Sequence, residues 1–192
     1  KKKFEYLGKY FKRKLEVVLT DGSQPIGKGI GPVLELIDVI KILDPKQEGP
    51  SDLEKKSLFL SGELLELTKN ARKGEGLEKA KEILYSGKAF EKFKQIIKAQ
   101  EGDLKKIKIA EFKKNILAKK NGKISEIDNK KINFLARVAG CPSEKSAGLY
   151  LYHPLGDKVN KGDKILTIYA ESKSRLKEAV KIYNKFHPIK IK

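Results

Sequence analysis

The sequence predicts an α/β remnant, made of a strand-loop-helix unit plus further helices, followed by a small α+β carboxyl-terminal domain with barrel-sandwich-like strands. Two observations predict this class. The first half repeats apolar residues at helical spacing after one β-branched run, whereas short β-rich runs with turn residues begin near residue 105. We therefore expect one domain over residues 1–103 and a second over 104–192. The chain has 192 residues and 39% apolar content, enough to bury one or two cores.

The first predicted elements are a helix, a strand and a loop. Residues 1–14 carry apolar residues at helical spacing, and the run Leu15–Leu19 is short and β-branched like a strand. After a glycine-punctuated loop, Pro32 suits the first position of a helix that runs to Leu43. Because this helix has little polar face, it should be buried on most sides, as in an α/β layer. One such unit cannot complete a doubly wound sheet, so we expect the missing strands upstream of Lys1.

Three more helices are predicted after a linker at residues 44–50. Ser51 and Glu54 have the spacing of a capping box, which predicts a helix from there to about Thr68. Two further helices fit apolar residues at helical spacing, and glycines separate them. Their apolar positions are Leu77, Ala80, Ile83 and Leu84 in one, and Phe90, Phe93, Ile96 and Ile97 in the other.

The carboxyl-terminal domain is predicted to combine strands with two amphipathic helices. Strands are expected over residues 107–118, 148–153 and 164–169, with a tight turn at Asn121-Gly122. Asp128 suits the cap of a helix whose apolar face holds Ile132, Leu135, Ala136 and Ala139. The last helix has an apolar face of Leu176, Ala179, Val180, Tyr183 and Phe186, and residues 188–192 are expected to form an edge strand.

The charge balance is strongly basic but does not indicate specific nucleic-acid recognition. The net charge is +18, yet only Arg13, Arg72, Arg137 and Arg175 are arginines, the side chains that base edges and phosphates favour. The lysines are also spread along the chain and interleaved with glutamate. We therefore interpret most of them as solvated helix faces.

The composition also predicts the compartment of the protein and indicates whether the sequence is a fragment. Cys141 is the only cysteine, so no intramolecular disulfide framework or cysteine zinc site is expected, and a reducing cytoplasm fits best. No apolar run approaches the ~20 residues that cross a bilayer, and no membrane partner is expected. Methionine is absent even at position 1, which indicates a fragment of a longer chain.

The loop Gly27-Lys28-Gly29-Ile30-Gly31 is a candidate phosphate cradle because glycines let backbone amides approach an anion at a helix start. Its glycines are spaced G-x-G-x-G, and no lysine is followed by serine or threonine, so neither common phosphate fingerprint is complete. The alternative is an ordinary tight turn between a strand and a helix, which the incomplete fingerprint favours.

The remaining chemical side chains do not form a predicted site. His153 and His187 each precede a proline and have no partner at metal or triad spacing, so no metal site is expected. Cys141 precedes Pro142 without a nearby histidine and is interpreted as a packing residue rather than a nucleophile. Glu63 and Glu66 are interpreted as solvated charge on a helix. No catalytic residue is assigned.

A run with two Gly-Asp turns, from Gly156 to Leu166, resembles runs in biotinyl and lipoyl carrier domains. Lys173 stands at about the distance of the lysine that those domains modify. In such domains that lysine lies on a tight hairpin, whereas a helix is predicted to follow here. A non-catalytic interaction module or a carrier module is therefore the alternative function.

Taken together, several segments resemble the carboxyl-terminal part of the thymidine phosphorylase and archaeal AMP phosphorylase family. The segment from Thr20 to Glu35 resembles the family's Q-P-hydrophobic-G loop and helix, and Phe59–Leu65 resembles its next helix. The stretch from Ala147 through the paired Gly-Asp turns to Glu171 resembles its terminal domain. The Tyr-Ala-Glu ending is closer to the archaeal AMP branch.

The resemblance implies a glycosyltransferase that transfers a pentosyl group to inorganic phosphate, which is the co-substrate; no cofactor is implied. AMP would yield adenine and ribose bisphosphate, and thymidine would yield thymine and deoxyribose phosphate. The family's phosphate loop and catalytic residues are not among these residues, so none is carried over. At most the loop with Asp21, Ser23, Gln24 and Gly27 neighbours the site. The expected partners are a nucleotide or nucleoside, the rest of the parent chain and further copies in a homo-oligomer.

Overall fold

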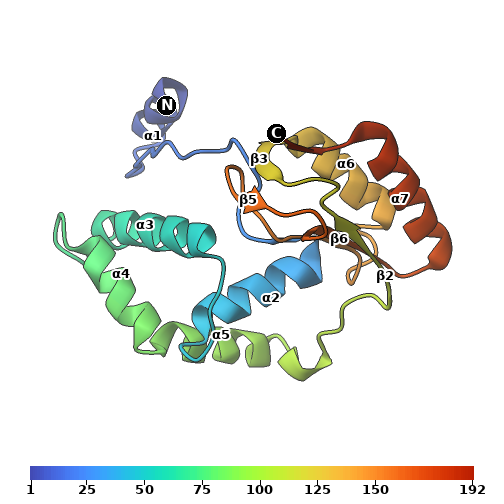
Figure 1. Cartoon of the computed structure of the whole chain (residues 1–192). Coiled ribbons are helices and arrows are strands. Elements are labelled where there is room, and N and C mark those ends of the chain that lie inside the picture. The colour runs from blue at the N-terminus through green and yellow to red at the C-terminus, as the bar shows by residue number, and fades with distance from the viewer. The chain divides into compact units, whose positions relative to one another are not determined.

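The computed structural model describes all 192 residues, which form two compact units (Figure 1). The helical unit comprises residues 1–21 and 41–100, and the sheet unit comprises residues 22–40 and 101–192. Seven α-helices and two small antiparallel sheets make up the chain, so the mixed helix and strand content is confirmed. The barrel-sandwich arrangement and the division into domains at 1–103 and 104–192 stay predictions. No helix of the chain combines the length and the apolar character that crossing a bilayer requires.

The helical unit is built from amphipathic helices around a small core. The core consists of Leu58, Ala80 and Leu84, and Leu65 packs against it. The periodicity predicted these helices because it places the apolar side chains on one face. Their bounds are α1 at Lys2–Tyr10, α3 at Ser51–Leu67, α4 at Gly76–Tyr85 and α5 at Lys88–Ala99.

Two glycines let α3 and α4 touch through their backbones. A Cβ atom on Gly62 would lie 2.7 Å from the Leu77 backbone nitrogen, and one on Gly76 would lie 2.2 Å from the Gly62 carbonyl oxygen. Both distances are shorter than any side chain tolerates, so no larger residue fits without moving a helix. The close approach brings the two helices together over their shared core.

The predicted capping box at the start of α3 is wrong. Pro50 occupies the N-cap position, and no side chain caps the helix. The helix therefore starts one residue earlier than the Ser51–Glu54 spacing requires, which places Ser51 inside the first turn. The carboxylate of Glu54 instead accepts a hydrogen bond from the Tyr85 hydroxyl at 2.7 Å, which ties α3 to the end of α4.

The predicted strand at Leu15–Leu19 is also wrong. The segment forms no strand, and Leu19 is 81% exposed. A β-branched run becomes a strand only where a neighbouring strand pairs with its backbone, and none of these 192 residues does so. The first strand of the chain is instead β1, a short strand at Gly29–Ile30.

The sheet unit contains a four-stranded sheet in the order β1-β4-β6-β2 and a three-stranded sheet in the order β5-β3-β7. All paired strands are antiparallel. The first sheet comprises β1, β4 at Gly148–Leu151, β6 at Lys164–Ala170 and β2 at Phe112–Leu117. The second comprises β5 at Lys158–Val159, β3 at Gly122–Ile127 and β7 at Ile189–Ile191, which is the predicted edge strand.

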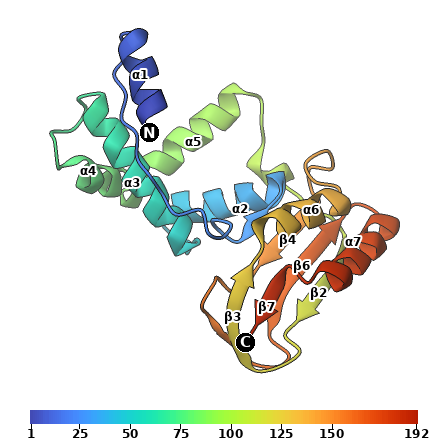
Figure 2. The same cartoon turned by 90° about the horizontal axis from the view of Figure 1, so that it is seen from above.

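Helices α6 (Asn129–Ala139) and α7 (Lys173–Phe186) pack together and cover the four-stranded sheet (Figure 2). The cap predicted at Asp128 is confirmed, since its carboxylate accepts the amides of Lys130 and Lys131. The core lies between these helices and the sheet and includes fully buried residues from both: Leu135, Ala139, Leu149, Leu166, Ile168 and Ala179.

Two predicted features near the start of the second domain, the strand over residues 107–118 and the tight turn at Asn121-Gly122, differ from the structure. The strand expected over residues 107–118 begins at Phe112, after a short 3-10 helix, η1, at Leu104–Lys106. Asn121-Gly122 does not close a hairpin, because β2 and β3 on either side of it belong to different sheets. The Asn121 side chain instead accepts the amide of Lys161 at 2.7 Å.

Candidate functional site

The loop before β1 is the candidate site predicted from the sequence. The predicted residues Ser23, Gln24 and Gly27 lie in the sheet unit, whereas Asp21 lies in the helical unit, where its carbonyl accepts the Lys56 ammonium at 2.8 Å. Gln24 is anchored, since its side-chain oxygen accepts the Leu155 amide at 2.6 Å. Gly27 has φ of 72°, which a residue with a Cβ adopts only with strain.

Helix α2 (Pro32–Leu43) begins directly after this loop, and its own carboxylates bind the loop's amides. The backbone nitrogens of Lys28 and Gly29 both donate to Oδ2 of Asp38 at 2.7 Å, and Asp38 is only 1% exposed. The Gly31 amide donates to Glu35 Oε1 at 3.0 Å. The groups that would cradle a phosphate are therefore filled by anions of the chain itself, which is the geometry of a tight turn.

The glycines of the loop allow this turn to press against α2. A Cβ atom on Gly29 would lie 2.4 Å from the Leu34 carbonyl, so the strand and the helix approach more closely than a side chain permits. Gly31 has φ of +125°, in the region that favours glycine. One sequence signal could have revealed the arrangement: Asp38 is a lone carboxylate within an otherwise apolar stretch of the helix.

A polar and aromatic patch on the four-stranded sheet was missed by the sequence reasoning. The Tyr152 hydroxyl and Thr167 Oγ1 lie 3.0 Å apart, and that hydroxyl of Thr167 donates to Asn115 Oδ1 at 2.8 Å. The Tyr150 and Tyr152 rings meet at 5.2 Å between centroids. Because Leu149, Leu166 and Ile168 point toward α6 and α7, these alternating residues lie on the opposite face. The alternation in Leu-Tyr-Leu-Tyr was the available signal.

Two phenols on this sheet, those of Tyr150 and Tyr169, are held in their neutral form. Burial raises the pKa of Tyr150, and the negative charge of Asp38 adds to the rise. Burial likewise raises the pKa of Tyr169, with further contributions from Tyr152 and Tyr150. At neutral pH these groups can donate hydrogen bonds but do not act as bases.

The histidines and the cysteine, the other side chains considered for chemistry, make contacts within the fold. His153 Nδ1 lies 3.4 Å from Asp157 Oδ2, and the His187 ring packs edge-on against Tyr183 at the end of α7. Cys141 packs against the core, and burial raises the pKa of its thiol. No three His, Cys, Asp or Glu side chains are grouped so as to hold a metal ion.

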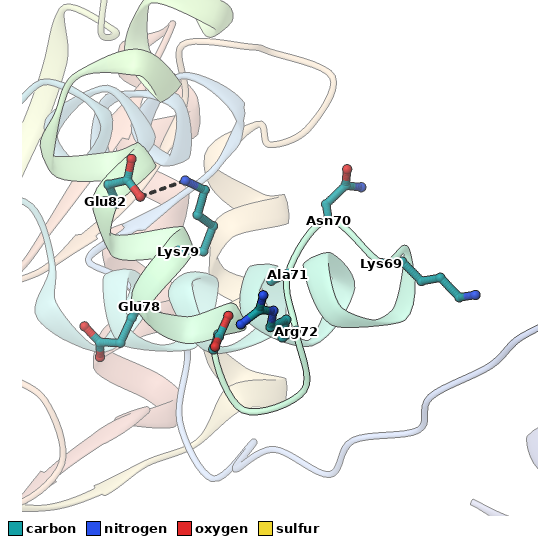
Figure 3. Close-up of a pocket in the computed structure, with 8 residues that line it drawn as sticks. Lys69, Asn70, Ala71, Arg72, Glu78, Lys79 and Glu82 are labelled. Atoms are coloured by element: carbon teal, nitrogen blue, oxygen red, sulfur yellow. Dashed lines mark hydrogen bonds and ion pairs between the residues drawn. The ribbon is translucent and has the colours of Figure 1, made fainter.

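The helical unit contains an open pocket of about 790 Å³ at the connection between α3 and α4 (Figure 3). Its lining residues are Lys69, Asn70, Ala71, Arg72, Glu75, Glu78, Lys79 and Glu82. Part of the charge on this lining is paired, since Lys79 Nζ lies 2.7 Å from Glu82 Oε2. The lining carries equal numbers of cationic and acidic side chains and no serine, threonine, cysteine or histidine, so it offers no candidate nucleophile.

Comparison with known proteins places the sheet unit in a family. Residues 123–190 match the family described as the carboxyl-terminal domain of pyrimidine nucleoside phosphorylase. The AMP phosphorylase of Methanococcus aeolicus is 43% identical over 193 residues, which cover 99% of this chain and 38% of that protein. The chain belongs to the pyrimidine nucleoside phosphorylase family. The resemblance to the carboxyl-terminal part of these enzymes is confirmed.

Two further phosphorylases are similar to this chain over most of its length. The AMP phosphorylase of Pyrococcus horikoshii is 44% identical, with 99% of this chain and 38% of that protein covered. A protein of Rhodopseudomonas palustris, provisionally named a thymidine phosphorylase, is 44% identical over 91% of this chain and 34% of its own length. The chain thus spans little more than a third of the relatives it matches.

Proposed function

We propose that this chain forms the carboxyl-terminal part of an enzyme that splits the N-glycosidic bond of a nucleotide or nucleoside with inorganic phosphate. The observation that carries the proposal is the 43% identity to an AMP phosphorylase across 99% of the chain. AMP is the favoured substrate, with adenine and ribose bisphosphate as products. Thymidine, giving thymine and deoxyribose phosphate, is the other candidate. Inorganic phosphate is the co-substrate, and no other cofactor is proposed.

Phosphorolysis sets three demands on a site. A phosphate oxygen attacks the anomeric carbon, the bond to the base breaks with positive charge developing on the sugar, and the departing base takes up a proton. The site must therefore hold phosphate in line, stabilise the developing charge and position a general acid.

The loop before α2 does not meet the first demand, because Asp38 and Glu35 occupy its amides. We assign the phosphate donors and the general acid to parts of the parent enzyme beyond these 192 residues. The role proposed for the segment from Asp21 to Gly27 is that of a wall beside the site. No catalytic residue is proposed within this chain.

The proposed partners follow from exposed apolar side chains in the helical unit. Phe4, Tyr6 and Tyr10 of α1 are each more than 60% exposed, and Leu19 is exposed as well. Such side chains gain stability when another surface covers them. We propose that the rest of the parent chain, or a further copy in a homo-oligomer, covers them.

A chimera tests the proposed function. This chain would replace the matched segment of Pyrococcus horikoshii AMP phosphorylase, and adenine release from AMP would be measured with and without phosphate. We expect phosphate-dependent release from the chimera and none from the 192 residues alone or from the relative truncated before that segment. A folded chimera that releases neither adenine from AMP nor thymine from thymidine would overturn the proposal.

The carrier-module alternative does not fit the position of Lys173. This lysine is the first residue of α7, and its ammonium lies 5.7 Å from the centre of the Phe112 ring. Ser172 caps the same helix through the Arg175 amide. A lysine in the first turn of a helix is not displayed as it would be on a hairpin tip. We therefore expect the intact mass to equal that of the unmodified sequence, and biotin or lipoate on Lys173 would favour the carrier.

A further inference from the structure

Six exposed lysines gather at one end of the sheet unit. We name this cluster the lysine end: Lys119, Lys120, Lys123, Lys158, Lys161 and Lys164. They come from the connection between β2 and β3, from the turn between β5 and β6, and from the strand residues next to them. Figure 2 shows the β2–β3 connection at the end of the unit where the chain terminus is marked.

Backbone hydrogen bonds hold the two lysine-bearing turns side by side. The Ala118 amide donates to the Asp163 carbonyl at 2.8 Å, and the Gly162 amide donates to the Ala118 carbonyl at 2.9 Å. The Asn121 side chain accepts the Lys161 amide at 2.7 Å. The cluster is therefore built on a fixed frame, although its members are up to 45 positions apart in the sequence.

No side-chain carboxylate pairs with the lysine end, and the nearest chain carboxylate outside the side chains is that of Lys192, whose backbone is hydrogen-bonded to that of Lys123. None of the six ammonium groups forms an ion pair, whereas Lys131 and Lys190 of the same unit pair with Asp128 and Glu126. The two nearby carboxylates are engaged elsewhere. Asp163 accepts the Asn160 amide at 2.7 Å, and Asp157 lies against the His153 ring.

Two of the lysines face each other directly across strands. Lys123 of β3 and Lys158 of β5 are register partners in an antiparallel pair. Like charges at such positions destabilise a sheet, so the pair has a cost that a bound anion would remove. Their neighbours on the adjoining turns add to the same positive potential.

We infer that the lysine end binds the phosphodiester backbone of nucleic acid without reading its bases. Lysine offers a compact point charge suited to backbone phosphates, and the cluster contributes neither the arginine fork nor the aromatic ring that base recognition uses. A cluster of six cations fits a repeating polyanion better than a single phosphate. The surface is separate from the proposed phosphorolysis and does not depend on it.

Fluorescence anisotropy with labelled single-stranded RNA of about 20 nucleotides tests the inference. For six phosphate contacts on a single strand, the plot of log affinity against log salt should have a slope near about −4. The triple variant Lys119→Gln, Lys120→Gln, Lys161→Gln should bring the slope to about −2 and weaken binding about tenfold or more at about 50 mM salt. Oligo(U) and oligo(A) should bind with similar affinity.

A matched variant separates a local site from diffuse charge. Lys98→Gln, Lys105→Gln and Lys177→Gln together remove the same charge from three exposed lysines outside the lysine end that form no ion pair. This variant should retain the parent's salt slope, and thermal melts should confirm that both variants fold. Equal weakening by the two triple variants would overturn the inference, as would a strong base preference. Two other results would overturn it as well: no binding to RNA, or binding to phosphatidylserine vesicles without binding to RNA.

Discussion

Replacing Asp38 should remove the hydrogen bonds that hold the loop before α2 and so destabilise the protein. The Asp38 carboxylate accepts two backbone amides at 2.7 Å and is 1% exposed, so Asp38→Ala leaves the Lys28 and Gly29 donors without their acceptor. We expect this variant to lower the free energy of unfolding. The same change would also free two amides at the start of a helix, where an anion is favoured.

The magnitude follows from the number and kind of hydrogen bonds. A hydrogen bond to a charged group contributes about 1.5–3 kcal/mol, and two are lost. Some of this is returned because a carboxylate no longer has to be buried, so the net loss should be about 3 kcal/mol. Asp38→Asn keeps an acceptor oxygen but not the charge, and neutral bonds are about half as strong, so it should lose about half as much.

Urea unfolding of the parent and variants measures this order. Glu35→Ala is the matched control, because Glu35 lies on the same helix and accepts one loop amide at 3.0 Å but is exposed. It should lose less than about 1 kcal/mol. The reasoning is refuted if Asp38→Ala costs no more than Glu35→Ala. In the parent, a phosphate titration should leave the NMR amide shifts of Lys28 and Gly29 unchanged, and saturating shifts there would show that Asp38 does not fill the loop.

Three further predictions concern packing and ionisation. In an unconstrained helix Gly62→Ala would raise the free energy of unfolding by about 1 kcal/mol. Here the added Cβ would meet the α4 backbone, so we expect a lower unfolding midpoint. The control Ser61→Ala, at an exposed position, should stay near the parent. Burial raises the pKa of the Cys141 thiol, so iodoacetamide should modify it at pH 8 more slowly in the folded than in the urea-unfolded chain; equal rates would contradict this. Burial also raises the pKa of Tyr183 to about 12 from 10.0. Between these values the unfolded phenol loses its proton first, so the parent should lose about 2 kcal/mol relative to Tyr183→Phe as pH rises from 10 to 12, and parallel stability curves would refute the shift.

Local patterns predicted the helices of this chain because helix formation depends on residues three and four apart. The apolar faces of α2, α6 and α7 and the cap at Asp128 all followed from such spacing. The capping box failed by a single residue, since Ser51 and Glu54 have the right spacing but the helix starts after Pro50.

Strand predictions failed where the outcome depended on a distant partner. The run Leu15–Leu19 has strand composition but no strand beside it. Asn121-Gly122 has the composition of a hairpin turn, yet β3 pairs with β5 and β7 rather than with β2. The polar patch of Tyr152, Thr167 and Asn115 depends in the same way on the register of β4, β6 and β2, which one sequence does not reveal.

The glycine loop and the lysine end show that a motif or a cluster of charges predicts anion binding only when the carboxylates of the chain around it are known. A G-x-G-x-G sequence looks the same whether its amides face solvent or a carboxylate nine or ten residues later, and only the fold reveals that Asp38 fills them. The lysine end shows the opposite case. In the sequence its members look like scattered surface lysines, but in the fold the pairing of β3 with β5 brings Lys123 opposite Lys158. An external anion gains most where no side-chain carboxylate of the chain already occupies the positive groups. On that ground the lysine end, rather than the loop that resembles a phosphate cradle, is where this chain should bind phosphate groups.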